Sequence, residues 1–153
     1  MAAEKPKVNA RFLYLMCNDV AAMKRFYADL LGMKPAGFMD SPQFAYFVVQ
    51  SEGLQMMWFR ADKPLPVATA FASQPGWQGG TLETTSWGIL IPEEDFAATV
   101  ERLKTGGVTC FASAPQWLQD SYWGFPVLDP MGATVEVYST PREKPKATVW
   151  PGA

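Results

Sequence analysis

The chain has 153 residues, 48% of them hydrophobic and 14% aromatic, with a formal net charge of −2 at pH 7. This length suits one domain or two small halves with a shared core. The near-neutral charge provides no basic face for nucleic acid, and no run approaches the roughly 20 apolar residues of a membrane span. The sequence has no histidine, which excludes Ser-His-Asp and Cys-His catalysis and removes the commonest metal ligand.

The first half is typical of a β-α-β-β-β unit. A strand over residues 11–18 has apolar side chains on both faces, so both faces need cover. Asp19 is suited to cap a helix that runs to about Leu31, and Gly32 to end it in the left-handed conformation. The predicted buried stripe of the helix is Val20, Met23, Phe26, Tyr27 and Leu30. Three strands follow, at about residues 34–39, 44–50 and 54–59.

The second half repeats this pattern after a connector at residues 61–84 that is rich in Pro, Gly, Ala and Gln. A strand over 85–91 leads into a helix that opens at Pro92 and ends at Gly106 and Gly107. Its predicted buried stripe is Phe96, Ala97, Val100 and Leu103. Strands follow at 108–112, 121–128 and 133–138. The predicted modules are therefore residues 11–60 and 85–139, with a tail at 140–153 that wraps the surface or crosses to a partner.

The two halves superpose in sequence. The step from the first strand to the glycine that ends the helix is 15 residues in both, from Cys17 to Gly32 and from Ile91 to Gly106. The number of residues between the last turn and the last strand is also the same in both halves. Internal repetition of this kind predicts an α+β fold of two tandem β-α-β-β-β modules. An unrepeated α+β domain is the alternative. The two cysteines, Cys17 and Cys110, lack a metal-ligand spacing, which favours buried free thiols over a disulfide or a nucleophile.

The hairpin at residues 124–138 carries the most informative polar residue. Its first strand ends at Leu128, a turn follows over 129–132 with Gly132 at its end, and a second strand begins at Ala133. Alternation points Val135 and Val137 one way, and Thr134, Glu136 and Tyr138 the other. A lone carboxylate in an apolar strand is either a surface residue or a site residue.

Two stretches carry a family resemblance. Residues 17–35 (CNDVAAMKRFYADLLGMKP) and 125–137 (FPVLDPMGATVEV) resemble signatures of the vicinal oxygen chelate superfamily. That superfamily contains glyoxalase I, extradiol dioxygenases, fosfomycin-resistance enzymes and bleomycin-resistance proteins. The resemblance implies that the two modules form a curled, cup-shaped mixed sheet with the helices outside. It specifies the fold far more than the reaction.

The same resemblance implies a divalent metal in the cup of the family's enzymes, held from four strand positions. In this sequence those positions hold Phe12, Met57, Ser86 and Glu136, and only Glu136 is a residue that the family expects there. A phenyl ring has no lone pair to donate, and a thioether suits Cu(I) rather than Mn, Fe, Ni or Zn. A shifted register would offer Gln55, which restores a single neutral ligand. We therefore expect no metal and no other cofactor.

A cup-facing surface rich in aromatic residues and Met is typical of pockets for planar or amphipathic molecules. The predicted ligand-binding residues are Phe12, Tyr14, Met16, Met57, Phe59, Ser86, Trp117, Trp123, Glu136 and Tyr138. Alternatively, these side chains merely fill the cup, and Trp117, Tyr122 and Trp123 pack against the connector that contains Trp77. Glu136 has three interpretations: an anchor for a ligand amine or hydroxyl, a vestigial ligand paired with Lys, Arg or Tyr, or a general base with a raised pKa.

The predicted function is metal-independent binding or sequestration of a small aromatic or amphipathic molecule. In this the protein resembles the bleomycin-resistance branch of the superfamily, whose members confer antibiotic resistance. The near-neutral charge argues against bleomycin itself. The alternatives are a glyoxalase-like lyase or isomerase, or a dioxygenase, with Glu136 as the catalytic residue, and a scaffold whose Trp residues form an interface. The resemblance also implies a homodimer. The N-terminus lacks an apolar signal core, so we expect a cytoplasmic protein with neither nucleic acid nor membrane as partner.

Overall fold

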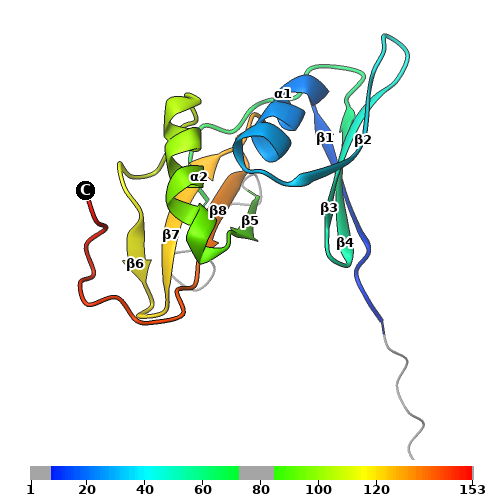
Figure 1. Ribbon diagram of the computed structural model, residues 1–153. Coiled ribbons are helices and arrows are strands. Elements are labelled where there is room, and N and C mark those ends of the chain that lie inside the picture. The colour runs from blue at the N-terminus through cyan, green and yellow to red at the C-terminus, as the bar shows by residue number, and fades with distance from the viewer. Residues whose placement is uncertain (1–7, 73–84, 153) are drawn as a thin grey trace, which may run out of the picture.

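The computed structural model describes residues 8–72 and 85–152. Two β-α-β-β-β modules follow one another along the chain, which confirms the predicted α+β fold (Figure 1). The elements of the first module are β1 (Phe12–Cys17), α1 (Val20–Lys24), η1 (Arg25–Leu30), β2 (Lys34–Asp40), β3 (Ala45–Ser51) and β4 (Leu54–Arg60). Those of the second are β5 (Ser86–Leu90), α2 (Glu93–Thr105), β6 (Gln116–Leu118), β7 (Tyr122–Leu128) and β8 (Thr134–Ser139).

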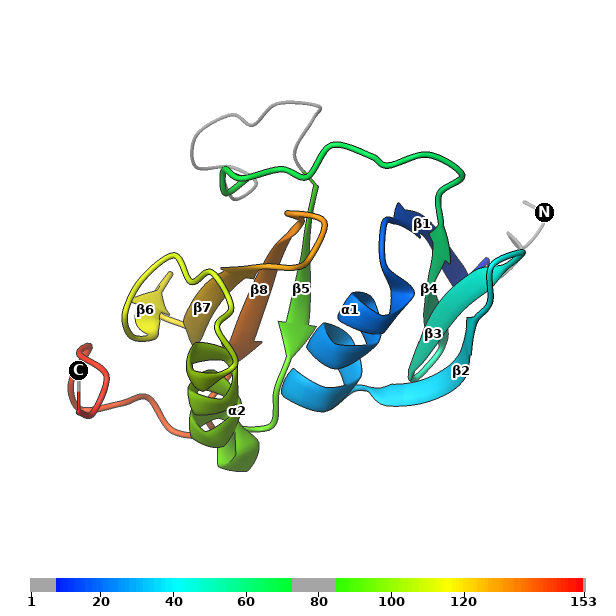
Figure 2. The same cartoon turned by 90° about the horizontal axis from the view of Figure 1, so that it is seen from above.

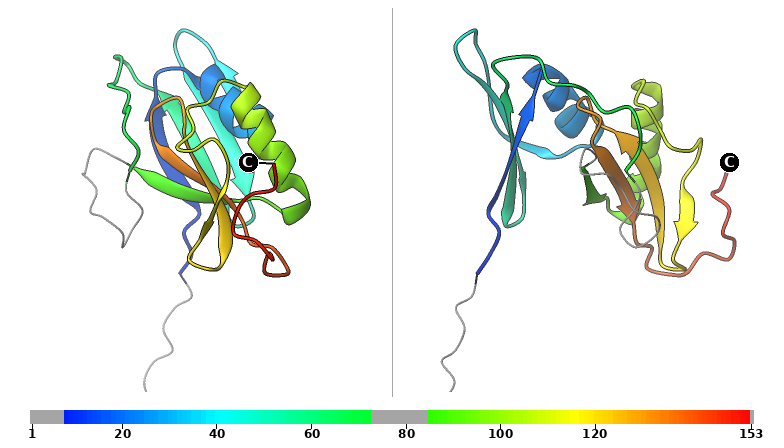
Figure 3. Two further views of the ribbon diagram at one scale, coloured as in Figure 1. Left: turned by 90° about the vertical axis from the view of Figure 1, so that its left-hand side faces the viewer. Right: turned by 180° about the vertical axis from the view of Figure 1, so that it is seen from behind.

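Each module forms a four-stranded mixed sheet of the same topology. The strand order is β1-β4-β3-β2 in the first sheet and β5-β8-β7-β6 in the second. The first strand of each module is parallel to the last, and the remaining pairs are antiparallel. Seen from above, α1 lies between the first sheet and β5, so the opposite face of the first sheet turns away from the second module (Figure 2). The view from behind shows the same separation of the two sheets (Figure 3, right).

The first helix begins as the sequence predicts. The Asp19 carboxylate accepts from the backbone N–H groups of Ala21 and Ala22, and Gly32 ends the helix at a φ of +84°. The helix widens into the π-helical segment η1, where the N–H of Leu31 bonds to the carbonyl five residues earlier, that of Phe26. The wider turn brings Leu31 into the core in place of the predicted Leu30.

The second helix buries Phe96, Val100 and Leu103 as predicted, but Ala97 is exposed and Thr99 takes its place in the core. The Thr99 hydroxyl donates to the carbonyl of Asp95 at 2.9 Å, so its burial leaves no unpaired donor. The side chain therefore packs on its methyl group while its polar atom is satisfied locally.

The strand predicted at residues 108–112 is wrong. Cys110 forms only an isolated bridge with Val127, and the second strand of this module is β6 instead. The N–H of Phe111 donates to the carbonyl of Pro126, and the N–H of Leu128 donates to the carbonyl of Thr109, so this segment lies against the end of β7. Pro115 then separates it from β6.

One hydrophobic core runs through both modules, and a buried polar contact joins them. Tyr27 of η1 stacks on Trp58 of β4, with ring centroids 4.2 Å apart. Its hydroxyl donates to Oδ2 of Asp129 in the β7–β8 turn at 2.7 Å. Burial raises the pKa of both groups. For Asp129 this increase is larger than the decrease caused by the hydrogen bonds from Tyr27 and from the turn. The other carboxylate oxygen accepts from the N–H groups of Met131 and Ala133.

Cys17 is fully buried next to this junction as a free thiol, as predicted, and burial raises its pKa to about 11. Such a thiol is poorly reactive because the thiolate is the nucleophile. Cys110 is also free but only half-buried.

The connector and the tail both pack on the second module. The N–H of Ala68 donates to the carbonyl of Met131, and the N–H of Ala72 donates to Oγ1 of Thr134. The tail runs outside β6, where Val149 pairs with Gln116 (Figure 1). Trp150 is then in edge-to-face contact with Phe96 and Trp123. Trp77 and the rest of residues 73–84 lie outside the described residues. Within the described part of the chain, no helix is long and apolar enough to cross a membrane.

Candidate functional site

The outward face of the first sheet carries a group of exposed aromatic side chains. Tyr14 and Met16 of β1 lie beside Met57 and Phe59 of β4 in the sheet register, and Phe12 precedes them on the same face. The exposed fractions are 55% for Phe12, 64% for Tyr14 and 50% for Met16. The rings of Tyr14 and Phe59 stack with centroids 6.0 Å apart. All three side chains lie on β1, an edge strand of the first sheet.

Two residues that the sequence reasoning missed extend this surface. Phe44 and Tyr46 contact each other at 5.6 Å, and each also contacts the ring of Phe59. The alternation of β3 against β4 is the signal that would have found Tyr46, which is the register partner of Phe59. We call this surface the aromatic face; it consists of Phe12, Tyr14, Met16, Phe44, Tyr46, Met57 and Phe59.

The second sheet carries the predicted carboxylate. Ser86, Glu136 and Tyr138 lie on one face, together with Thr134, and we call this surface the carboxylate face. Glu136 is half-buried between two residues that have no side-chain donor, Gly88 on β5 and Pro126 on β7.

Burial raises the pKa of Glu136, and a hydrogen bond from Tyr122 partly opposes this. Burial together with the neighbouring Glu136 raises the pKa of Tyr122 to about 12, which keeps its hydroxyl a donor at neutral pH. Oε1 of Glu136 is buried and has no hydrogen-bond partner among residues 8–72 and 85–152.

Gly124 explains how the carboxylate fits there. A Cβ at this position would lie 2.9 Å from Oε1 of Glu136 and 2.6 Å from a methyl group of Leu118. Only a glycine leaves room for the carboxylate to lie against β7 between these neighbours.

Trp117 and Trp123 lie away from both faces. Trp123 is only 6% exposed and points to the same side of β7 as the core residues Phe125 and Val127. Its ring is in edge-to-face contact with Trp117 at 5.2 Å and with Trp150 at 5.0 Å. The structure therefore brings five predicted residues together on the aromatic face, three on the carboxylate face, and two in this tryptophan cluster.

The residues at the family's metal positions do not fit a divalent metal. Phe12 and Met57 lie on the aromatic face, whereas Ser86 and Glu136 lie on the other sheet, so one chain offers a carboxylate and a hydroxyl at most. Among the residues that the structure describes, no group of three His, Cys, Asp or Glu side chains could hold a metal ion. One carboxylate and one weak neutral ligand do not compete with water for Zn²⁺ or Mn²⁺.

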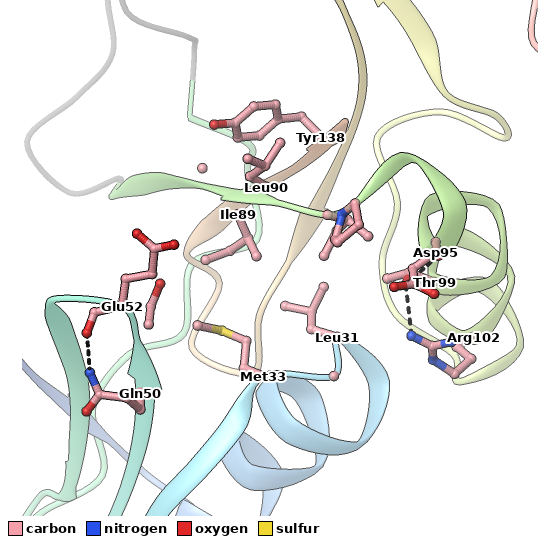
Figure 4. Close-up of a pocket in the computed structure, with 15 residues that line it drawn as sticks. Leu31, Met33, Gln50, Glu52, Ile89, Leu90, Asp95, Thr99, Arg102 and Tyr138 are labelled. Carbon is pink, nitrogen blue, oxygen red and sulfur yellow. Dashed lines mark hydrogen bonds between the residues drawn. The ribbon is translucent and has the colours of Figure 1, made fainter. Parts of the chain in front are cut away.

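Among the described residues, two clefts lie between the modules, and sequence reasoning found neither because their walls combine residues of both halves. The larger, of about 770 Å³, has an apolar floor formed by Leu31, Met33 and Ile89 (Figure 4). Glu52 lies at one rim and Arg102 at the opposite one. The smaller, of about 500 Å³, is lined by Trp58, Trp87, Met131 and their neighbours beneath the connector.

The larger cleft connects to the carboxylate face. Gly88, Leu90 and Tyr138 line the cleft and also lie on the same side of the second sheet as Glu136. Figure 4 shows Tyr138 beside Leu90 at the end of the cleft away from Met33. Glu136 itself does not line the cleft, but Gly88, which is opposite it in the sheet, does.

Solved structures with this fold include enzymes of different reactions. The chain is similar to oxidase ChaP-H2, with a TM-score of 0.63 and 19% identity over 89% of this chain and 96% of that one. It is also similar to a lactoylglutathione lyase from Agrobacterium tumefaciens, with a TM-score of 0.56 and 18% identity over 88% and 96% of the two chains. No curated protein sequence matches the chain.

A glyoxalase/bleomycin resistance protein/dioxygenase from Alicyclobacillus acidocaldarius has a TM-score of 0.54 and 15% identity, over 86% of this chain and 91% of that one. At these identities the likeness shows the fold alone. The family model named Glyoxalase/Bleomycin resistance protein/Dioxygenase superfamily matches residues 10–137. Together with the two β-α-β-β-β modules, this match shows that the chain belongs to the glyoxalase/bleomycin resistance protein/dioxygenase superfamily.

Proposed function

We propose that this protein binds and sequesters a small aromatic or amphipathic molecule without using a metal, in the manner of the bleomycin-resistance branch of the superfamily. The observation that carries the proposal is the aromatic face. Stacking on exposed rings such as Tyr14 and Phe59 binds a planar ligand without a nucleophile, a general base or a metal. Protection against an aromatic antibiotic is the biological role that this activity would serve.

The chemistry of the aromatic face supports an apolar ligand. Its seven members carry no formal charge, and Met16 and Met57 add polarizable thioethers that adapt to ring edges. Soluble monomers rarely expose a contiguous apolar surface of this kind, and such a surface usually marks an interaction site.

Removing one ring should weaken binding. We expect Tyr14→Ala to lower affinity for an aromatic ligand about three- to tenfold, because a stacked aromatic pair contributes roughly 0.5–1.5 kcal/mol. The ligand is first selected by tryptophan fluorescence from a panel of aromatic antibiotics and metabolites, and affinity is then measured by calorimetry.

Phe38→Ala is the matched control, because Phe38 is 43% exposed but contacts the core residue Phe47 on the other face of the same sheet. Equal loss in both variants, or a flat response to the whole panel, would contradict the proposal.

A homodimer would bring the aromatic face and the carboxylate face together. The carbonyls of Arg11 and Cys17 accept bonds from β4, so alternation turns the backbone groups of Phe12, Tyr14 and Met16 away from it. Thr85 and Ile91 likewise bond to β8, which leaves those of Ser86, Gly88 and Leu90 turned outward.

We place β1 of one copy beside β5 of the other, because α1 separates these strands within one chain (Figure 2). This pairing would cover the exposed rings and form the predicted cup from two copies of the chain.

A charge in the proposed interface should dissociate the dimer. We expect Tyr14→Glu to shift the protein to a monomer in sedimentation velocity at micromolar concentration, because a buried unpaired carboxylate is strongly unfavourable. Phe38→Glu introduces the same charge on the other face of the first sheet and should leave the dimer intact. A monomeric wild type, or a dimeric Tyr14→Glu, would contradict this arrangement.

The second candidate is an enzyme, a glyoxalase-like lyase or isomerase or a dioxygenase, with Glu136 as general base. The raised pKa of Glu136 and its contact with Tyr122 favour it, because a base works best with a pKa near the operating pH. Turnover that is lost in Glu136→Gln while ligand binding is retained would distinguish this function from sequestration.

A further inference from the structure

Glu136 has more hydrogen-bonding capacity than the protein uses. An ionised carboxylate has about four acceptor positions, and Tyr122 supplies a donor to one of them. The other oxygen, Oε1, is buried without a donor among the described residues. A buried acceptor without a partner is unfavourable, so the binding of a donor there is favoured over its remaining in water.

Glu136 receives no side-chain donor from the residues directly opposite it in the sheet. Its register neighbours are Gly88, which has no side chain, and Pro126, which has no N–H group. Tyr138 lies on the same face next to Gly88, where its ring would be 3.2 Å from a Cβ on that glycine. Gly88 and Tyr138 also line the larger cleft, so the cleft ends at residues that flank Glu136 in the sheet.

We propose that the ligand is an aromatic molecule carrying a hydroxyl or protonated amine that donates to Glu136, with its ring stacked on the aromatic face that the proposed dimer brings beside the carboxylate face. This inference rests on the proposed binding function and specifies its ligand class. Glu136 thereby selects among planar molecules, whereas Tyr14 and its neighbours bind them by stacking. Molecules that present only acceptors at this position, such as aryl carboxylates, are excluded by repulsion.

Matched probes test this selection. 2-Naphthol and 2-naphthylmethylamine present a donor, 2-methylnaphthalene presents none, and 2-naphthoate presents only acceptors. On the wild-type protein we expect at least one donor probe to bind roughly tenfold or more tightly than 2-methylnaphthalene, since hydrogen bonds to charged groups are among the stronger ones. Affinity that falls with added salt identifies the ammonium as the preferred donor, and salt-independent affinity identifies the hydroxyl.

Two variants assign the preference to Glu136. Glu136→Leu should remove the donor preference while leaving the affinity for 2-methylnaphthalene within about twofold, and Tyr14→Ala should weaken all probes by a similar factor. Glu101→Gln, on the exposed side of α2, is the matched carboxylate control and should keep the preference.

Circular dichroism of Glu136→Leu checks that the fold is intact, and Glu136→Gln supplies a second variant if it is not. Equal affinity for donor probes and 2-methylnaphthalene on the wild type would overturn this inference but not the binding function. Absence of binding by every probe would overturn both.

Discussion

Asp129→Leu should lower the free energy of unfolding by about 3–5 kcal/mol, because it leaves three buried donors without an acceptor at roughly 1–3 kcal/mol each. Those donors are the Tyr27 hydroxyl and the N–H groups of Met131 and Ala133. Asp129 is only 5% exposed, so water does not replace it. Urea denaturation at pH 7 measures the loss, and near-ultraviolet dichroism of the Tyr27–Trp58 pair reports whether the packing around the Tyr27 ring is retained.

Asp129→Asn separates shape from charge. Its amide oxygen still accepts from the turn and its NH₂ group can donate to the Tyr27 oxygen, so we expect a smaller loss of about 1–2 kcal/mol. Burial raises the pKa of Asp129 above its ordinary 3.8, so the folded state holds the proton more tightly than the unfolded state. This contribution to stability is complete below pH 3.8 and is lost as the pH rises through the folded-state pKa. The deficit of Asp129→Asn relative to wild type should therefore shrink from pH 3.5 to pH 7; a constant deficit would contradict the shift.

Gly132→Ala should cost about 2–4 kcal/mol and detach the connector from the second module. The residue has a φ of +79°, and its added Cβ would lie 1.9 Å from the carbonyl oxygen of Ala68. The left-handed conformation alone costs an alanine roughly 1–2 kcal/mol. Relieving the clash also breaks the bond from Ala68 to Met131, so hydrogen exchange at the Ala68 and Ala72 amides should accelerate.

Gly107→Ala isolates the backbone part of this cost. Gly107 has a φ of +75°, but a Cβ there would meet nothing within 4 Å. We expect a loss of about 1–2 kcal/mol in denaturant unfolding and unchanged exchange at Ala68. Similar losses of unfolding free energy in the two glycine variants would contradict this prediction, because they would show that the connector moves away from the added methyl group at no cost in stability.

The parts of the fold that could be predicted are those set by residues close in sequence. The cap at Asp19, the left-handed end at Gly32 and the turn before β8 each depend on a few neighbouring residues, and each is where the sequence predicts it. The burial of Leu31 instead of Leu30 was missed because the π-helical segment changes the period of the helix. The second strand of the second module was misplaced because pairing with β7, rather than local propensity, decides which residues form it.

The candidate site was predictable as far as strand alternation reaches. Alternation along β1 and β8 assigns Tyr14 and Glu136 to the predicted faces. Trp123 was predicted to contact the ligand. Gly124 pairs with Tyr138 of the carboxylate face, so the neighbouring Trp123 points to the core instead. The clefts between the modules could not be predicted, because they depend on how two sheets distant in sequence are oriented.

The C-terminal tail covers one edge of the second sheet and so limits how further copies of the chain can add to that sheet. A module with a free strand at each side can add copies head to tail indefinitely. Here Val149 occupies the outer side of β6 at Gln116, and Trp150 fixes the tail in the core beside it. The strand at the far end of the second sheet is therefore closed to β2 of another molecule. In the proposed dimer, reciprocal contacts through β1 and β5 would occupy one edge of each sheet and leave β2 as the free edge strand of each copy.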